Sequence, residues 1–509
     1  MVAGATGLRL RRALVVAGLT ATGTVVLIAP AGAVDVATDA ELRAAWGDPA
    51  TAEITLTTDV DLACTGSVTR SSATPLALDG AGHTLTNECP QLGLQNSGLG
   101  MITLRDVTYT GAPGSGQGVG TVGVVALEGT TIAGHGGAGV GSFLGVAATG
   151  SVVIDNGGNG LGSSDIAVTN TTISGNAAQG VSAAATVVAA GSTISGNGDV
   201  GIDADDAVAV SDSIVADNGG GGIETSDTVT IENTLVDANG ATGVVTSDAA
   251  TLAETTVSGH GIVGVITAAL LDVTHSTITA NNTGLGTFSD LAIRNSTVTA
   301  NTATGITADS ATVVYSTVVA NGGNAVDANT VEMFATVLDD SGATNCAVGT
   351  MMTSAGDNWA DDDSCGLTGP GDAEDPGGDP GLGALADNGG PTQTQLPATT
   401  SPLIDRVALD ACQTGPATGV TTDQRGEARP GAFTDGCDTG AVEVQGSEPV
   451  VPTTTTPGPT TLAPTSPSGG ADSLPRTGTT GQRPLAVVGG LLVAVGLAVT
   501  ARRRVGRAR

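Results

Sequence analysis

The sequence predicts an all-β protein whose main part is a right-handed parallel β-helix of roughly 12 turns. A short phrase returns through the middle of the chain, for example at 170–176, 191–197 and 295–301. The repeat is about 21 residues long, which is too short for two helices, and it is rich in Val, Ile, Thr, Gly, Asn and Asp. Three short strands per repeat, separated by Gly, Asn and Asp corners, are typical of one β-helix turn.

Two apolar positions mark the strands of each repeat. The first lies inside the phrase, at Val153, Ile173, Ile194, Ile214, Leu235, Val257, Ile278, Val298, Val318 and Val337. The second follows about eight residues later, at Val181, Ile202, Ile223, Val244, Val265, Ile306 and Val326. A leucine-rich repeat has a similar length, but its Leu-x-x-Leu-x-Leu consensus is absent. Connections between parallel strands are almost always right-handed, which sets the predicted hand.

A column of asparagines follows the phrase and supports the same fold. It comprises Asn176, Asn197, Asn218, Asn239, Asn281, Asn301 and Asn321, with His260 standing in once and Asp340 at the end. Asn tolerates the left-handed backbone of a tight corner, and stacked Asn side chains can hydrogen-bond from turn to turn. We favour this structural interpretation over a row of side chains that binds ions or sugar.

The first 33 residues predict export from the cell. Arg9, Arg11 and Arg12 precede an apolar run at 13–29, and Ala31 and Ala33 fit a small-residue cleavage site. The pair of arginines is compatible with twin-arginine export, but the surrounding residues favour an ordinary secretory signal.

Residues 34–106 are expected to form the N-terminal cap and the first turns. Thr38 and Glu41 have the spacing of a helix capping box, and a short amphipathic helix up to Trp46 would cover the open first turn. The stretch 78–85, Leu-Asp-Gly-Ala-Gly-His-Thr-Leu, resembles the opening turns of pectin-lyase-like β-helix proteins. The clear repeats then occupy 107–340.

Beyond residue 340 the period fails, and 341–445 are predicted to form a disulfide-rich C-terminal cap module. Its motifs include Leu-Ala-Asp-Asn-Gly-Gly-Pro-Thr at 385–392, Asp-Gln-Arg-Gly at 423–426 and Cys-Asp-Thr-Gly-Ala at 437–441. Together they resemble the choice-of-anchor Q domain, a C-terminal module of bacterial surface proteins. The resemblance implies a surface protein with an exchangeable anchor and brings no catalytic residues.

Six cysteines in an exported chain predict disulfides, for which fifteen pairings are possible. Proximity in sequence favours pairing Cys64 with Cys89, Cys346 with Cys365 and Cys412 with Cys437. All three would lie at the ends of the solenoid, where terminal turns lack a stacking neighbour. The absence of a Cys-x-x-Cys motif argues against a metal site built from these thiols.

The C-terminal 64 residues predict attachment to a cell wall. Residues 446–473 form a disordered linker rich in Pro, Thr and Ser. Leu474, Pro475, Thr477 and Gly478 match the sortase recognition motif, and an apolar membrane helix at 485–501 with a terminal Arg cluster completes the sorting signal at 474–509. The resemblance implies that a sortase joins Thr477 covalently to peptidoglycan of a Gram-positive bacterium, the precursor being held only transiently in the membrane.

The charge of the chain excludes one class of partner. The fragment from Val34 to Thr477 holds all 50 acidic residues but only eight of the 17 basic ones, which gives a formal charge of −42, and the chain has no lysine. Such a surface repels nucleic acid and attracts divalent cations, so calcium is a possible ligand although no cofactor is required. Solubility of a secreted rod also explains the charge.

Evidence for catalysis is weak. Asp203, Asp205 and Asp206 are the best candidates, near Asp227 and Asp248 at similar positions of later turns, but Asp is common at corners. His135 and His260 each lie in Gly-His-Gly, a fragment of the polygalacturonase signature whose other elements are missing. We therefore expect a non-catalytic surface rod with a structural, adhesive or ligand-binding role, the ligand being a glycan or a protein. The alternatives are an anchored polysaccharide lyase or glycoside hydrolase, and a rod stabilised by calcium at an unknown site.

Overall fold

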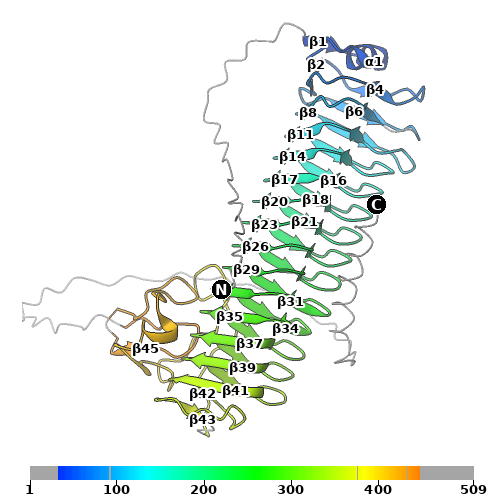
Figure 1. The fold of residues 1–509 in the computed structure, drawn as a ribbon. Coiled ribbons are helices and arrows are strands. Elements are labelled where there is room, and N and C mark those ends of the chain that lie inside the picture. The colour runs from blue at the N-terminus through cyan, green and yellow to red at the C-terminus, as the bar shows by residue number, and fades with distance from the viewer. Residues whose placement is uncertain (1–32, 91–92, 375–376, 433, 447–509) are drawn as a thin grey trace, which may run out of the picture.

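The computed structural model describes residues 33–90, 93–374, 377–432 and 434–446. They form one long parallel coil with a smaller unit against its flank (Figure 1). Two parallel sheets, of 27 and 16 strands, run along the coil, and the smaller unit has a two-stranded antiparallel sheet. The chain is therefore all-β, with three strands in a typical turn, as the sequence predicts.

The 16-stranded sheet takes one strand from each turn. In order its strands are β3 (Val60–Asp61), β6 (Thr84–Asn87), β9 (Thr108–Gly111), β12 (Thr131–Ala133), β15 (Val152–Ile154), β18 (Thr172–Ser174), β21 (Thr193–Ser195), β24 (Ile214–Ala216), β27 (Leu235–Asp237), β30 (Thr256–Ser258), β33 (Thr277–Thr279), β36 (Thr297–Thr299), β38 (Thr317–Val319), β40 (Val337–Asp339), β42 (Trp359–Ala360) and β43 (Ala373–Glu374).

The 27-stranded sheet takes two strands from most turns. One stack is β4 (Val68–Arg70), β7 (Leu94–Asn96), β10 (Val119–Thr121), β13 (Val140–Ser142), β16 (Leu161–Ser163), β19 (Val181–Ala183), β22 (Ile202–Ala204), β25 (Ile223–Thr225), β28 (Val244–Thr246), β31 (Val263–Thr267) and β34 (Thr283–Thr287). The other is β1 (Ala33–Val36), β2 (Glu53–Leu56), β5 (Leu76–Asp79), β8 (Ile102–Arg105), β11 (Val124–Glu128), β14 (Gly145–Thr149), β17 (Asp165–Thr169), β20 (Val187–Ala190), β23 (Val208–Ser211), β26 (Val229–Glu232), β29 (Ala250–Ala253), β32 (Leu271–Thr274) and β35 (Asp290–Arg294). The long strands β37 (Ile306–Val314), β39 (Val326–Phe334) and β41 (Cys346–Gly356) continue both stacks.

Helix α1 (Asp39–Gly47) covers the N-terminal end of the coil, as predicted (Figure 1). The Thr38 hydroxyl accepts a hydrogen bond from the Glu41 N–H, and the Glu41 carboxylate accepts one from the Ala37 N–H. The buried Trp46 donates from Nε1 to the Gln95 carbonyl at 3.0 Å. The helix is thus fixed at its start by side-chain caps and near its end by a bond to β7.

In the turns from β12 to β40, two corners use left-handed backbone geometry. One precedes the strand of the 16-stranded sheet, for example at Asn170 and Asp212, with φ of 49° and 50°. The other lies directly before the Asn column, for example at Gly196 and Asp217, with φ of 62° and 56°. The expectation that the column residues themselves supply this geometry is therefore wrong. Asp340, with φ of 50°, occupies the preceding corner position and does not end the column.

The Asn column is a buried ladder. Asn176 donates from Nδ2 to Asn197 Oδ1 at 2.9 Å, and Asn197 donates in the same way to Asn218. The ladder begins at Asn156, one turn earlier than the sequence suggests, and His260 interrupts it with its ring nitrogens near the carbonyls of Asn239 and Val236. The stacked hydrogen bonding is confirmed. Because the side chains are buried, the column has no face for ions or sugar.

The first apolar position is misassigned in three turns. Strand pairing aligns Ile194 with Val215 and Val236, not with Ile214 and Leu235. Ile214 is 42% exposed, whereas Val215 and Val236 are fully buried. At the last repeat, Leu338 aligns with Val318 in place of Val337. These strands carry two adjacent apolar residues, so the sequence alone does not show which of the two points into the core.

The coil is longer than the repeats indicate. The 16-stranded sheet gives about 16 turns against the predicted 12, because turns before residue 107 and after residue 340 lack the phrase. β41 pairs with β39, β42 with β40 and β43 with β42, so the coil continues to Glu374 within the segment assigned to the cap module.

Residues 377–446 turn back and lie along the flank of the coil (Figure 1). We call this segment the flank module. It contains β44 (Val407–Ala408), β45 (Gly436–Cys437) and a 3-10 helix (Gly415–Ala417). Instead of capping the open end, it packs against Tyr315, Phe334, Val337 and Trp359 on the outside of the coil.

The three predicted disulfides are present, Cys64–Cys89, Cys346–Cys365 and Cys412–Cys437. The first two lie at the ends of the coil, but the third lies within the flank module. Over the residues described, no helix is both long and apolar enough to cross a membrane. The predicted signal up to Gly32 and the predicted linker and sorting signal from Ser447 fall outside those residues.

Candidate functional site

The predicted catalytic candidates lie on the outer surface of the 27-stranded sheet and are not gathered into a cleft. Asp203 belongs to β22, where its Oδ2 accepts a bond from Gln179 Nε2 at 3.2 Å. Asp205 and Asp206 form the exposed turn between β22 and β23. Pairing of β23 with β26 and β29 places Asp206, Asp227 and Asp248 on one corner of successive turns. Asp227 and Asp248 accept bonds from the next backbone N–H, so turn formation accounts for them.

A different set of carboxylates forms the candidate metal centre. Among the described residues, Asp339, Asp340 and Asp361 are the one set of His, Cys, Asp or Glu whose ligand atoms all lie within 4.8 Å of one another. Asp339 ends β40, and Asp361 follows β42 one turn later. The Asp340 N–H donates to Asp361 Oδ2 at 3.2 Å, which holds the two corners together. Clustered carboxylate oxygens are the ligands that calcium prefers.

This acidic site lies where the coil meets the flank module. A pocket of about 570 Å³ is lined by the three aspartates and by Asp379, Leu382 and Gln395 from the module. Burial, followed by the charges of Asp340, Asp361 and Asp379, raises the pKa of Asp339 to about 7. The buried Asn345 donates to Asp361 Oδ1 at 2.6 Å, while its own Oδ1 has no hydrogen-bond partner. A divalent cation would offset the repulsion that now favours the protonated acid.

Sequence analysis missed this site, although a signal for it exists. Asp340 and Asp361 are separated by 21 residues, which is one turn of the coil. Asp340 ends the last clear repeat, whereas Asp361 lies beyond it, where the repeated phrase is no longer visible.

The two buried histidines are structural. His135 packs edge-on against Tyr109 with ring centroids 4.5 Å apart, and burial lowers its pKa to about 4. His260 takes a ladder position, where burial also lowers its pKa. Neither ring reaches the surface, so the Gly-His-Gly fragments do not form a catalytic site.

The sequence motifs of the flank module fasten it to the coil. Gln424 is fully buried and donates from Nε2 to the Ser276 carbonyl, to Thr277 Oγ1 and to Thr392 Oγ1. Its Oε1 accepts a bond from the Thr297 hydroxyl at 2.7 Å. One amide therefore joins strands β33 and β36 to two separate motifs of the module. These motif residues therefore hold the flank module against the coil.

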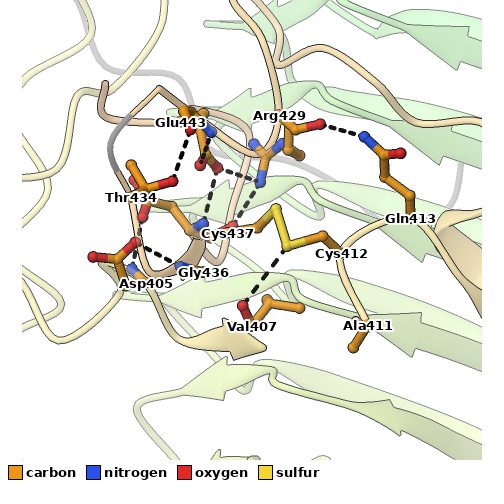
Figure 2. Close-up of a disulfide and its surroundings, with 12 residues drawn as sticks. Asp405, Val407, Ala411, Cys412, Gln413, Arg429, Thr434, Gly436, Cys437 and Glu443 are labelled. Carbon is orange, nitrogen blue, oxygen red and sulfur yellow. Dashed lines mark hydrogen bonds and ion pairs between the residues drawn. A yellow bond between two sulfur atoms is a disulfide. The ribbon is translucent and has the colours of Figure 1, made fainter. Parts of the chain in front are cut away.

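Arg429 makes a second set of contacts between the flank module and the coil. Its guanidinium lies 4.0 Å from the Tyr315 ring centroid and donates to the carbonyls of Asp438 and Gly440. Figure 2 shows it directed at Glu443, beside the Cys412–Cys437 disulfide; Nη1 and Oε2 are 3.4 Å apart. Burial raises the pKa of Glu443, and the Arg429 charge partly offsets this effect. An aromatic residue of the coil is thus enclosed by a buried ion pair of the module.

Of the other predicted site residues, the structure places Ala33 at the start of β1. Ala31 and the sortase motif residues Leu474, Pro475, Thr477 and Gly478 lie outside the described residues. No metal ligand among the cysteines was predicted, and all six are disulfide-bonded.

Comparison with known proteins agrees with the fold. Residues 91–269 match the family model described as a right handed beta helix region. No curated protein matches the chain. The fold is therefore a right-handed β-helix, with the hand that the sequence predicts.

Similar solved structures include the A-module of mannuronan C-5 epimerase AlgE6 from Azotobacter vinelandii, with 11% identity, a TM-score of 0.25 and coverage of 64% of this chain and 95% of that one. Pectate lyase Pel9A has 12% identity and a TM-score of 0.25 over 81% of this chain and 96% of that one. The catalytic domain of a GH87 α-1,3-glucanase in complex with nigerose has 10% identity and a TM-score of 0.20 over 65% and 69%.

Proposed function

We propose that the protein is an exported, non-catalytic rod attached covalently to the cell wall of a Gram-positive bacterium, where it has a structural, adhesive or ligand-binding role. The observation that carries this proposal is the order of the C-terminal segments. A Pro/Thr/Ser-rich linker, the motif Leu474-Pro475-Arg476-Thr477-Gly478, an apolar run and an Arg cluster follow the flank module in this order. Each has a physical task in sorting: spacing, cleavage, arrest in the membrane and retention on the cytoplasmic side.

The flank module supports the surface role. Its motifs resemble the choice-of-anchor Q domain, and Gln424 from those motifs and the nearby Arg429 bind the coil. The proposed partners are accordingly a sortase and peptidoglycan, joined through Thr477. No catalysis is proposed at Asp205, Asp206, Asp227 and Asp248, because these carboxylates lie on corners of the coil, three of them exposed and Asp227 half-buried. A glycoside hydrolase would need an acid and a base paired across the scissile bond.

Covalent attachment is tested by fractionating cells that express the full chain with its sortase. The wild-type protein should resist hot detergent and be released from the wall by muramidase. Replacing Leu474→Ala together with Thr477→Ala should move the protein to the membrane and the medium. The matched control, Leu462→Ala in the linker, should remain in the wall. Muramidase-dependent release of the double variant would contradict the proposal.

A second role, calcium binding at the end of the rod, is favoured by the grouping of Asp339, Asp340 and Asp361. A cation bound there would bridge β40 to the turn after β42 and would also face Asp379 of the flank module. The same ion would therefore hold both the last turns and the module.

The calcium role predicts a higher melting temperature of the 34–477 fragment in millimolar calcium than in chelator, by several degrees. Asp361→Asn should remove most of that increase, because it lowers the ligand charge and keeps the shape. Asp290→Asn, an exposed acid remote from the pocket, is the control and should respond like wild type. An equal calcium response in all three proteins would exclude the site.

A further inference from the structure

The turns that join the two strands of the 27-stranded sheet form one continuous corner along the rod, which we call the outer corner. Near the N-terminal end it carries five exposed apolar side chains, Leu99, Met101, Val122, Phe143 and Leu144. Pairing of Val125 with Val146 places Val122 and Phe143 in a single column, and Leu99 lies in the corresponding turn before Ile102, which pairs with Val125. Phe143 is 72% exposed and Leu99 63%. Three adjacent turns thus present an apolar patch to solvent.

The fold does not require apolar residues at this corner. One turn later the position is Ser164, and the next turn has Ala184 and Ala185, yet the strand pairing continues unchanged. Exposing large apolar groups is unfavourable, and a contiguous patch on a soluble protein usually marks an interaction site.

The same corner becomes acidic farther along the rod. Asp205 and Asp206 are followed on the next two turns by Asp227 and Asp248, which align with Asp206 through the pairing of β23, β26 and β29. Asp205, Asp206 and Asp248 are exposed and Asp227 is half-buried, and no Arg or Lys occurs between Arg105 and Arg294. No cation of the coil near them offsets their charge, so the field at this part of the corner attracts positive groups.

We propose that the outer corner from Leu99 to Asp248 binds a cationic polypeptide segment that has apolar residues at one end, which cover the Phe143 patch, and basic residues at the other end, which meet the acidic stack. Seven turn spacings separate the two ends, which at about 4.8 Å each gives about 34 Å. A helix of about 22 residues has this length. A second copy of this chain is an unfavourable occupant, because it would bring the same acidic corner and the like charges would repel each other.

This inference names a partner class for the proposed surface rod and rests on that role. Binding by the purified fragment 34–477 does not depend on wall attachment. A failed sorting experiment and a failed binding experiment therefore test separate statements.

The experiment measures binding of the fragment to a synthetic 22-residue Leu/Lys peptide, with its Leu residues in one end and its Lys residues in the other, by titration calorimetry. A peptide of the same composition with its Leu and Lys residues interspersed, and a peptide with Glu in place of Lys, serve as controls. The peptide with separate Leu and Lys ends should bind at least tenfold more tightly than either control. Its affinity should fall as salt is raised.

Two variant sets locate the contact. Leu99→Ser with Phe143→Ser, and separately Asp206→Asn with Asp227→Asn and Asp248→Asn, should each weaken binding about tenfold. The second set should also reduce the salt dependence. Their matched controls are Leu409→Ser, an exposed apolar residue of the flank module, and Asp217→Asn with Glu232→Gln and Glu254→Gln on other faces of the coil. All substituted positions except the half-buried Asp227 are exposed, so circular dichroism should show an intact fold.

Several results would overturn the proposal. They are equal binding of the three peptides, unchanged affinity in both corner variants, or equal losses in the control variants. Binding to zwitterionic lipid vesicles without binding to the Leu/Lys peptide would assign the patch to a membrane. A dimer in sedimentation that Phe143→Ser dissolves would assign it to a second copy.

Discussion

Asn218 shows how one side chain links three turns of the coil. Its Nδ2 donates to Asn239 Oδ1 on the following turn and to the Ile194 carbonyl, and its Oδ1 accepts two bonds from Asn197. Asn carries both an amide donor and a carbonyl acceptor on a short side chain, so a stack of identical residues satisfies itself. Ser and Thr form a second such stack, as when the Ser192 N–H donates to the Ser213 hydroxyl.

Replacing Asn218→Ala should lower the free energy of unfolding by about 2–4 kcal/mol, because it leaves the buried N–H groups of Asn197 without an acceptor. Asn329→Ala, which removes an exposed amide with one bond to Asp309, should change it by less than about 0.5 kcal/mol. Urea denaturation followed by circular dichroism measures both. Similar midpoints for the two variants would mean that the ladder does not stabilise the coil.

The identity of the ladder residues was predictable, but their backbone role was not. A periodic Asn is visible in sequence, whereas the left-handed residue before it is Gly, Asp or Ala by turn, as at Gly196, Asp217 and Ala238. No single residue type marks that position. In the same way, the pairs Ile214–Val215 and Leu235–Val236 are apolar at both positions, so the sequence does not show that Val215 and Val236 are the buried members. The two members of a pair differ in their exposure to solvent, and that exposure depends on the register of the strand.

At the scale of elements, the last turns differ from the rest in bringing acids together. β40 ends in Asp339, and the chain after β42 supplies Asp361 beside it. The folded state holds a proton on Asp339 up to a pKa of about 7, whereas the ordinary value for Asp is 3.8. Between about pH 4 and pH 7 the folded protein therefore binds more protons than the unfolded chain, and stability falls as pH rises.

Asp339→Asn should reduce this pH dependence in chelator. From pH 5 to pH 7.5 the wild-type protein should lose about 1–2 kcal/mol of stability more than the variant, a value reduced for solvent screening of a half-buried group. Below about pH 4 the contribution is fully present, and above pH 7 it is absent. Thermal melts at several pH values test this difference. Parallel curves for the two proteins would show that Asp339 titrates normally.

The existence of most elements could be predicted, but not the place of the C-terminal module. The capping box at Thr38 identified α1, and alternating apolar residues identified the strands. Nothing in sequence showed that Gln424 would reach Thr277 and Thr297, about 150 and 130 residues earlier. The threonines of the coil that the module contacts, Thr277, Thr297 and Thr317, recur with the repeat, so the sequence does not mark which turns meet the module.

In the whole molecule, similar contacts between neighbouring turns recur along one thin core, and these contacts stabilise the fold. A single cluster of buried side chains runs from Val36 to Leu367, and each turn contacts chiefly its neighbours. Such an architecture tolerates changes in the number of turns when register is kept. The count itself was underestimated because the terminal turns, which meet α1 or the Cys346–Cys365 disulfide, depart from the phrase.

Deleting residues 198–218 removes 21 residues and joins Asn197 to Gly219, so that Asn197 takes the place of Asn218 in the ladder. The variant should fold, and its maximum dimension in small-angle X-ray scattering should shrink by about 4.8 Å. Deleting 198–207 removes about half a turn and should abolish cooperative melting, because every later strand loses its partner. Equal stability of the two deletions would contradict turn-by-turn stacking.

The position of the flank module has a mechanical consequence. Tension on the tail beyond Gly446 does not enter the coil at its last strand, β43, because the module first distributes it through Gln424 and Arg429 to strands β33–β39. Several turns therefore share the load, and the last strands of the rod are not pulled apart one after another.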